Sequence, residues 1–224
     1  MLRQGLRWRL GGIRTHLVIA ARNVRRPATA LQVLARAARR PTVNGRWRLQ
    51  RFGKEALREV VAAADAAGAP VFVVYGTLLG WIRDGRLIPH DDDLDLALLD
   101  DDWHNAKALA DHLAASGWRV TWFGDDEVRF THARHGCVPV DVFRFRGVGD
   151  HWEGRAYSDK GTTLHRYRFP RHAVTPLAEG QVHGVKVRTP NDPEAFLEAH
   201  YGPDWRTPQD DWDYRTDAAS SQDG

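Results

Sequence analysis

Four aspartates stand within five residues of the chain, and their spacing points to a specific chemistry. They are Asp91, Asp92, Asp93 and Asp95. Negative charges packed so closely repel one another unless a cation lies among them. Hard divalent cations such as Mg²⁺ bind carboxylate oxygens and usually keep water and substrate phosphates in their coordination shell. The segment therefore predicts a metal site at which phosphate chemistry takes place.

The aspartate segment continues into an apolar strand. Alternation along residues 93–98 places Asp93 and Asp95 on one face of this strand and three leucines on the other. Residues two apart in a strand are separated by roughly 6.5–7 Å along the backbone. Two carboxylates at that separation can converge on one ion or bind two.

A glycine turn precedes the aspartates. The β-branched run 71–74 predicts a buried strand that leads to Gly76 and Thr77, where glycine permits a tight turn and the close approach of a ligand. Residues 78–82 predict a short helix whose N-terminal amides face an anion. The planar guanidinium of Arg83 either binds phosphate or pairs with the aspartates, and we favour phosphate.

A lone acidic residue, Asp141, lies in the apolar run 138–143. An unpaired carboxylate in a buried strand is energetically costly. A strand that carries Asp141 beside Asp93 and Asp95 would explain this placement, because the third carboxylate would complete a cage. We therefore expect the two strands to be neighbours in one sheet.

The rest of the pattern predicts alternating helices and strands. Apolar residues at helical spacing predict helices over residues 54–67, 103–116 and 192–200, the last with Asp192 as its N-cap. Apolar runs predict strands over residues 119–123, 128–132 and 138–145. The polar, aromatic and basic segment 150–170 is interpreted as facing the acceptor or phosphate, and a solvated loop has a similar composition.

The charges of the chain are distributed unevenly. Of the 32 Lys and Arg residues, fourteen lie in residues 1–54, which contain no Asp or Glu; the other 18 share residues 55–224 with all 29 acidic residues. The longest apolar stretch of this basic arm, residues 17–21, is too short for a signal peptide or a membrane span. A single cysteine, Cys137, excludes an intrachain disulfide and is compatible with a reducing compartment.

The basic arm predicts contact with an anionic membrane surface through residues 1–50. Nucleic-acid binding and a helix packed on the domain are the alternatives, and we consider nucleic acid the less favoured partner. We expect a basic helical arm over 1–52, a catalytic domain over 53–213 and a disordered tail over 214–224. The expected location is cytoplasmic, peripheral on the inner membrane face.

Several motifs together resemble the LicD family, whose relatives include fukutin-type proteins. The resemblance lies in Gly76-Thr77-Leu78-Leu79-Gly80, Arg83-Asp84, Ile88 to Asp95, Phe169-Pro170, Thr175-Pro176-Leu177 and Tyr201-Gly202-Pro203-Asp204-Trp205. It covers roughly residues 55–210. His90 departs from the pattern, since the family usually has Trp there. The resemblance implies an α/β nucleotidyltransferase (polymerase-β-like) fold, with a mixed sheet flanked by helices.

The resemblance also implies a reaction. Studied members of the family transfer a phospho-alcohol, such as phosphocholine or ribitol phosphate, from a CDP-activated donor to a sugar hydroxyl, with Mg²⁺ or Mn²⁺ bridging the donor phosphates. The acceptor would be a glycan or glycolipid of the cell envelope, such as lipopolysaccharide or capsule. The implied metal ligands are Asp91, Asp93, Asp95 and Asp141. The implied catalytic residues are Asp93, Asp95 and Asp141, the last completing the cage or taking the acceptor's proton. The implied substrate-binding residues are Gly76, Thr77, Arg83, His90, Arg166 and Tyr201.

Other functions fit parts of the same pattern. A true nucleotidyltransferase would use the same carboxylates to move NMP from an NTP, and a glycosyltransferase also uses an Asp-x-Asp metal site. A non-catalytic nucleotide-binding or scaffold protein is less favoured, because a degenerate site usually loses a ligand. Zinc binding by His132, His135 and Cys137 is less favoured than a turn at Gly136.

Overall fold

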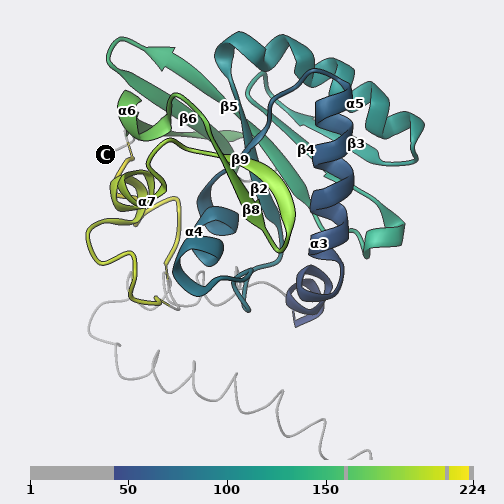
Figure 1. The fold of residues 1–224 in the computed structure, drawn as a ribbon, viewed down its shortest axis with the longest axis horizontal. Helices are drawn as coiled ribbons and strands as arrows, with labels where there is room; N and C mark the ends of the chain where they lie inside the picture. The colour runs from purple at the N-terminus through teal and green to yellow at the C-terminus, as the bar shows by residue number, and fades with distance from the viewer. Residues whose placement is uncertain (1–42, 159–160, 210–211, 222–224) are drawn as a thin grey trace, which may run out of the picture. The chain divides into compact units, whose positions relative to one another are not determined.

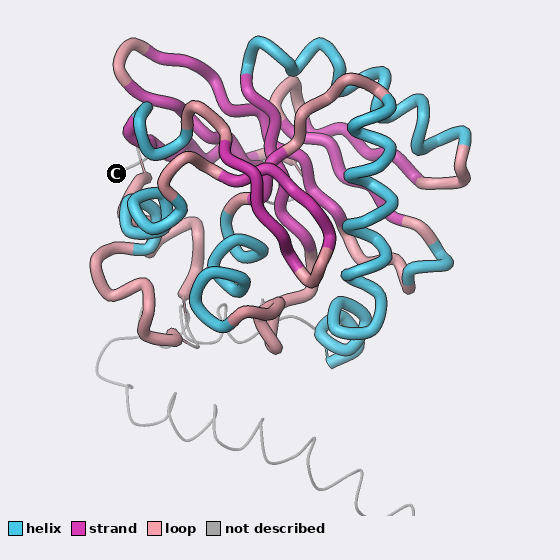
Figure 2. Tube along the Cα trace, viewed as in Figure 1, coloured by secondary structure: helices cyan, strands magenta, loops and turns pink. Residues whose placement is uncertain are grey.

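The computed structural model describes residues 43–158, 161–209 and 212–221. These residues form a mixed α/β structure in which helices border a central sheet (Figure 1, Figure 2). Residues 1–42 of the predicted basic arm lie outside the described residues. In the part of the chain that is described, no helix is both long enough and apolar enough to cross a membrane.

The sheet combines parallel and antiparallel strand pairs. Its strands are β1 (Phe72–Val73), β2 (Leu94–Leu99), β3 (Arg119–Phe123), β4 (Glu127–Thr131), β5 (Val140–Val148), β6 (His151–Ser158), β7 (Thr163–Pro170), β8 (Ala178–Val182) and β9 (Val185–Thr189). Their order is β3-β4-β5-β2-β1-β9-β8, and β6 and β7 extend the sheet from β5. The pairs β2–β5 and β1–β9 are parallel, and β1–β2 and β4–β5 are antiparallel. The predicted mixed sheet is confirmed.

The helices fall into two groups (Figure 1). They are α3 (Val43–Ala66), α4 (Tyr75–Asp84), α5 (Ala106–Ala115), α6 (Arg171–Val174) and α7 (Pro193–Tyr201), with 3₁₀ turns η1 (Asp100–Asn105) and η2 (Ala133–His135). Helix α3 contacts α5, whereas α7 contacts both α4 and α6. The first five residues of β2 are all buried, so this strand is covered on both faces.

Helix α3 begins at Val43, earlier than the predicted start at Lys54. The apolar stripe of the helix extends back to Leu49, which is 1% exposed. A Cβ atom added at Gly53 would meet Leu49 and Leu87 within 3.0 Å, so this turn packs closely on the segment before the aspartates. The boundary predicted between residues 52 and 53 falls inside this helix.

Other element predictions vary in accuracy. Strand β3 has the predicted bounds, and α7 begins at Pro193 with Asp192 as its N-cap, the Asp192 carboxylate accepting from the Ala195 amide at 3.0 Å. The helix predicted over 103–116 is divided into η1 and α5. The segment 150–170 forms the β6–β7 hairpin rather than a solvated loop, because alternate residues such as Trp152 and Phe169 enter the core.

An aromatic cluster holds the start of α4 in place. The rings of Phe169 and Phe196 stack with centroids 4.3 Å apart, and Phe145 stacks on both. Tyr75, the first residue of α4, packs against Phe145 and lies 4.8 Å from the His200 ring. The cluster therefore ties α4 to strands β5 and β7 and to helix α7.

The C-terminal segment packs on the domain. Nδ1 of His200 is hydrogen-bonded to Ser220 Oγ at 2.8 Å, the Arg168 amide donates to the Ser220 carbonyl, and Ala218 is 7% exposed. Burial lowers the pKa of His200 to about 3, so its neutral ring needs the neutral partner that Ser220 supplies. In the described structure, this part of the segment predicted to be a disordered tail over 214–224 contacts the domain.

Candidate metal centre

The turn from β1 into α4 brings backbone amides to the carboxylate of Asp95. Tyr75 adopts φ 44°, a left-handed conformation that is uncommon for a residue with a side chain. This turn places the amides of Gly76 and Thr77 near the Asp95 carboxylate, the Thr77 amide 3.4 Å from Oδ2. In return, the Asp95 amide donates to Thr77 Oγ1 at 2.8 Å. The anion at this helix N-terminus is therefore a protein carboxylate in the described structure.

Three of the predicted carboxylates converge. Asp91, Asp93 and Asp95 each offer an oxygen, and these oxygens all lie within 4.8 Å of one another. Gly76 makes room for them, since a Cβ atom there would come within 2.6 Å of Asp91 Oδ2 and 3.1 Å of Asp95 Oδ2. Among the described residues, this is the group of acidic, His or Cys side chains that could hold a metal ion.

The electrostatics of this group favour a bound cation. Burial raises the pKa of Asp91 to about 6. Burial and the neighbouring carboxylates raise the pKa values of Asp93 and Asp95 well above their ordinary range. Within the described chain, none of the three forms an ion pair with Lys, Arg or His. A divalent cation among them would neutralise the repulsion, so the donor set fits Mg²⁺ or Mn²⁺, whose preferred ligands are carboxylate oxygens.

Asp141 lies beside this group but is already paired. It stands opposite Asp95 in the parallel β2–β5 pair, which confirms the predicted neighbouring strands. Its carboxylate accepts two hydrogen bonds from Arg129 of β4, Nε to Oδ1 at 2.6 Å and Nη2 to Oδ2 at 2.7 Å. Burial opposes the charge of Arg129, but these bonds and the charge of Asp141 outweigh it and raise the pKa of Arg129. Asp141 is therefore not one of the carboxylates that converge within 4.8 Å, and its role as a metal ligand stays a prediction.

Two residues next to Asp141 were not found from the sequence. Arg129 is one, and the available signal was a basic residue between Val128 and Phe130 in an apolar strand, the counterpart of the lone Asp141. Glu127 is the other; it is 2% exposed, and its carboxylate accepts from the Tyr157 amide at 2.8 Å. Burial, followed by repulsion from Asp141, raises the pKa of Glu127 to about 8.

Of the predicted substrate-binding residues, Gly76, Thr77 and Tyr201 adjoin the carboxylates. Burial and the charges of Asp95, Asp91 and Asp93 raise the pKa of Tyr201, whereas Arg83 lowers it. Tyr201 therefore lies within electrostatic reach of both the carboxylate cluster and Arg83. The Tyr201 ring also packs on Trp212, with centroids 4.5 Å apart.

Arg83 and His90 lie at the edge of the cluster. The Arg83 guanidinium donates to its neighbour Asp84 at 2.8 and 3.1 Å, so its ion pair in this structure is with Asp84. His90 lies near the same residue, because its charge is among those that lower the pKa of Asp84. A phosphate would have to compete with Asp84 for Arg83.

Arg166 is placed apart from this group. It lies on the exposed face of β7, opposite Arg155 of β6. The β6–β7 hairpin extends the sheet from residues 145–148 of β5, beyond Asp141. The structure therefore places Arg166 on a different strand pair from the carboxylate group, and its predicted role in substrate binding stays a prediction.

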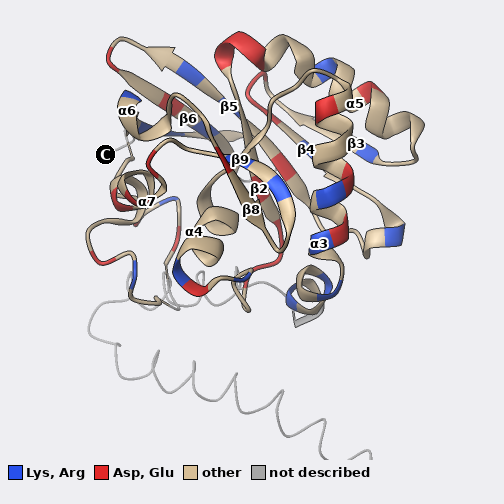
Figure 3. Cartoon of the chain, viewed as in Figure 1, with Lys and Arg blue, Asp and Glu red and all other residues tan. Residues whose placement is uncertain are grey.

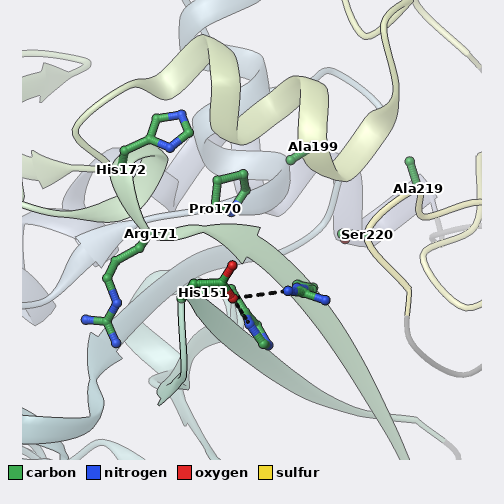
Figure 4. A pocket seen from close by; sticks show the side chains of 9 residues that line it. His151, Pro170, Arg171, His172, Ala199, Ala219 and Ser220 are labelled. Atoms are coloured by element: carbon green, nitrogen blue, oxygen red, sulfur yellow. Dashed lines mark hydrogen bonds and ion pairs between the residues drawn. The ribbon is translucent and has the colours of Figure 1, made fainter.

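A cavity of about 660 Å³ lies elsewhere on the domain (Figure 4). Its lining residues are Asp150, His151, Arg168, Pro170, Arg171, His172, Ala199, Ala219 and Ser220. Asp150 is paired with His151 and Arg168, each at 3.1 Å, and Arg171 lies over the Trp152 ring at 4.7 Å. The cations of this cavity are thus largely engaged with the protein, and the carboxylate cluster does not line it.

Comparisons with known proteins define the class to which the site belongs. Residues 68–192 match the family model described as LicD/FKTN/FKRP, nucleotidyltransferase domain. This range extends from the end of α3 to the start of α7 and includes the four aspartates and Asp141. The chain therefore belongs to the LicD family, as its motifs indicated.

Individual relatives agree with the family. The human ribitol-5-phosphate transferase FKTN is 28% identical over 169 residues, covering 74% of this chain and 36% of the relative. The mouse ribitol 5-phosphate transferase FKRP is 31% identical over 172 residues, covering 71% of this chain and 33% of the relative. The chain thus spans about a third of the length of these relatives. Among solved structures, the crystal structure of ANT(2")-Ia in complex with adenylyl-2"-tobramycin has a TM-score of 0.46 at 20% identity, covering 72% of this chain and 81% of that one.

Proposed function

We propose that this chain is a metal-dependent phosphotransferase with a nucleotidyltransferase-type fold. It moves a phospho-alcohol from a CDP-activated donor to a hydroxyl of a glycan or glycolipid. The observation that carries this proposal is the convergence of Asp91, Asp93 and Asp95 within 4.8 Å, with Asp95 buried, Asp91 and Asp93 half-buried, and no cationic partner among the described residues. Family membership and the similarity to the ribitol-5-phosphate transferases FKTN and FKRP support transfer of a phospho-alcohol.

Each residue of the cluster has a defined task in this reaction. Asp91, Asp93 and Asp95 would hold Mg²⁺ or Mn²⁺, which supplies neutralisation of the charge on the donor phosphates. The Thr77 hydroxyl and the α4 amides keep Asp95 in one orientation, and Gly76 leaves the space that the Asp91 and Asp95 carboxylates occupy. Positioning of this kind carries most of the barrier reduction in phosphoryl transfer.

The chemical step exchanges a phosphoanhydride bond of the donor for a phosphate ester bond to the acceptor. The acceptor hydroxyl oxygen attacks the phosphorus that carries the alcohol, the bond from that phosphorus to the oxygen shared with CMP breaks, and CMP leaves. The hydroxyl proton passes to a carboxylate, for which Asp141 is the candidate once Arg129 releases it. The side chain of Asp141 is 3% exposed, so it is shielded from bulk water.

The products separate this function from NMP transfer. The protein is incubated with Mn²⁺ and CDP-ribitol, CDP-glycerol, CDP-choline or an NTP, with and without glycan acceptors, and CMP and pyrophosphate are quantified. We expect CMP release that depends on the acceptor. Pyrophosphate from an NTP, with no CMP from any CDP-alcohol, would instead establish a nucleotidyltransferase. Products from neither donor class would favour a nucleotide-binding or scaffold role.

We also propose peripheral attachment to an anionic membrane, on the cytoplasmic face. The first turns of α3 expose Trp47, Arg48, Arg51 and Lys54, and basic residues mark this end of the helix in Figure 3. Tryptophan and basic residues together suit the interface of an anionic bilayer, where each cation contributes about 1 kcal/mol. Replacing the three cations with Gln should reduce sedimentation with phosphatidylglycerol vesicles. Neither the wild-type protein nor the variant should sediment with phosphatidylcholine vesicles. Equal sedimentation of the variant and wild-type protein would assign the contact to another surface.

A further inference from the structure

A row of three charged residues crosses the sheet beside the metal centre. Arg129 of β4 stands opposite Asp141 of β5, and Asp141 stands opposite Asp95 of β2. Residues opposite one another in neighbouring strands point to the same face of a sheet. The row therefore connects the metal cluster to a cation through a single shared neighbour, Asp141.

The guanidinium engages both carboxylate oxygens of Asp141. The two hydrogen bonds measure 2.6 and 2.7 Å, a bidentate geometry that directs lone pairs of both oxygens toward Arg129. A Mg²⁺ ligand must place a lone pair about 2.0–2.1 Å from the ion. A metal ion and Arg129 are also like charges that repel one another. Full pairing with Arg129 and coordination of the metal therefore compete for Asp141.

Arg129 is also positioned to interact with an incoming anion. Its side chain is 38% exposed, whereas that of Asp141 is 3% exposed, so the guanidinium reaches the surface of the site. Its carbon Cζ lies 5.4 Å from the centre of the Phe123 ring, which supports the flat face of the guanidinium. A phosphate offers the same paired oxygen acceptors as a carboxylate, so it can replace Asp141 without loss of the bidentate bond.

We propose that Arg129 exchanges partners during the reaction. In the metal-free protein it holds Asp141, and when the metal and the donor bind it releases Asp141 to the metal site and pairs with a donor phosphate. This inference rests on the proposed function, because it requires both a metal and a phosphate-bearing donor. Arg129 thus weakens metal binding in the absence of donor and strengthens donor binding in the presence of metal.

The test measures binding to the full chain with two separate probes. Mn²⁺ affinity without donor is measured by electron paramagnetic resonance, and CDP-ribitol affinity at saturating Mn²⁺ by calorimetry. We expect Arg129→Gln to tighten Mn²⁺ binding and to weaken CDP-ribitol binding, each by on the order of tenfold. Arg144→Gln is the matched control: Arg144 also pairs with an aspartate, Asp100, with Nε to Oδ1 at 2.6 Å, and neither affinity should change.

A second substitution separates hydrogen-bond geometry from charge. Arg129→Lys keeps the positive charge but loses the paired donors, so it should shift both affinities in the same directions as Arg129→Gln, by smaller factors. It also serves in place of Arg129→Gln if that variant does not fold.

The outcomes distinguish failure of the Arg129 exchange from failure of the proposed metal site. Opposite shifts for Mn²⁺ and CDP-ribitol in the Arg129 variants, with none in the control, support the exchange. Unchanged or weaker Mn²⁺ binding in the Arg129 variants overturns it and leaves the metal site intact. Absence of Mn²⁺ binding in every variant, wild type included, overturns the metal site and the exchange together.

Discussion

Two acidic regions of the same domain differ in their counter-ions. Asp126, just before β4, is 3% exposed and accepts from Arg146 at 2.7 Å and from Arg155 at 3.4 Å. Asp93 and Asp95, on the aspartate segment and β2, have raised pKa values and form no ion pair among the described residues. A buried carboxylate with arginine partners contributes to the fold, whereas crowded carboxylates without them, Asp95 buried and Asp93 half-buried, make the metal-free fold less stable. The second region therefore has the properties expected of a ligand site.

Asp141 lies between these two cases. It has one arginine partner, Arg129, and it neighbours the unpaired group through Asp95. Its surroundings therefore allow two arrangements. In one, Asp141 pairs with Arg129 and stabilises the fold; in the other, it would face the proposed metal site. The comparison can be tested by changing one region at a time.

The largest effect is expected from Asp93→Asn. Loss of a ligand charge should reduce turnover on the order of 10³-fold, because charge stabilisation at the reacting phosphates is lost. The same substitution removes a repulsive charge, so the free energy of unfolding of the metal-free protein should rise. Turnover is measured by CMP release and stability by urea unfolding without metal.

Asp101→Asn is the control for this prediction. Asp101 is an exposed residue of η1, and its substitution should change neither quantity. Full turnover of Asp93→Asn, or of the wild-type protein in EDTA, would contradict the metal centre.

A smaller effect is expected from Gly76→Ala. The added methyl group would lie 2.6 Å from Asp91 Oδ2, so the carboxylate must move out of the cluster. Mn²⁺ affinity should fall by about 10–100-fold, as when the support of a metal ligand is removed. The matched control is Gly147→Ala, where the nearest atom is the flexible end of Arg171 at 3.2 Å. Equal Mn²⁺ affinity of the two variants would show that Asp91 is not a ligand.

The sequence predicted the acidic half of this site better than its basic half. Alternation placed Asp93 and Asp95 on one face, and a lone acid in an apolar run placed Asp141 on the adjacent strand. Both are properties of single strands, which a period of two reveals. The pairing of Arg129 with Asp141 depends on the register between β4 and β5, which the sequence pattern does not specify.

The same limit explains the other differences. Arg83 pairs with its own neighbour Asp84, and the spacing of charges along the sequence does not show which aspartate it binds. The C-terminal segment is small and polar, so its composition predicted disorder, yet Ser220 bonds the buried ring of His200. The turn of α3 around Gly53 lies against Leu87, a contact with a distant part of the chain that helical spacing alone does not reveal.

The counterpart substitution, Asp126→Asn, should affect stability alone. It removes the partner of two guanidinium groups, Arg146 and Arg155, whose side chains are 26% and 22% exposed. Because both arginines remain partly solvated, the expected loss in the free energy of unfolding is about 1–3 kcal/mol, measured by urea unfolding. Turnover should stay close to that of the wild-type protein. A loss of turnover as large as that of Asp93→Asn, without loss of stability, would remove the distinction between the two regions.

The smallest effect is the pH dependence of stability, and its sign follows from the raised pKa of Asp91. The pKa of this carboxyl is about 6 in the folded protein and roughly 3.9 in an unfolded chain. The folded state therefore binds the proton more tightly than the unfolded chain does. The contribution of the Asp91 carboxyl to the free energy of unfolding is least favourable above pH 6 and improves as the pH falls from about 7 toward 4. Asp93 and Asp95 act in the same direction, since their pKa values are also raised.

Metal should reverse this trend, because a bound cation requires the ionised carboxylates and releases their protons. The measurement is the melting temperature at pH 5.5 and 7.5, with EDTA or with saturating Mn²⁺. Other groups also titrate, so the comparison is made between the wild-type protein and Asp93→Asn, which lacks one of the coupled carboxyls. We expect the metal-free wild-type protein to gain more stability at pH 5.5 than the variant does, and Mn²⁺ to stabilise it more at pH 7.5 than at pH 5.5. The same pH response in both proteins, unaffected by Mn²⁺, would mean that the three carboxylates are solvated like ordinary surface acids and that the contrast with Asp126 has no energetic basis.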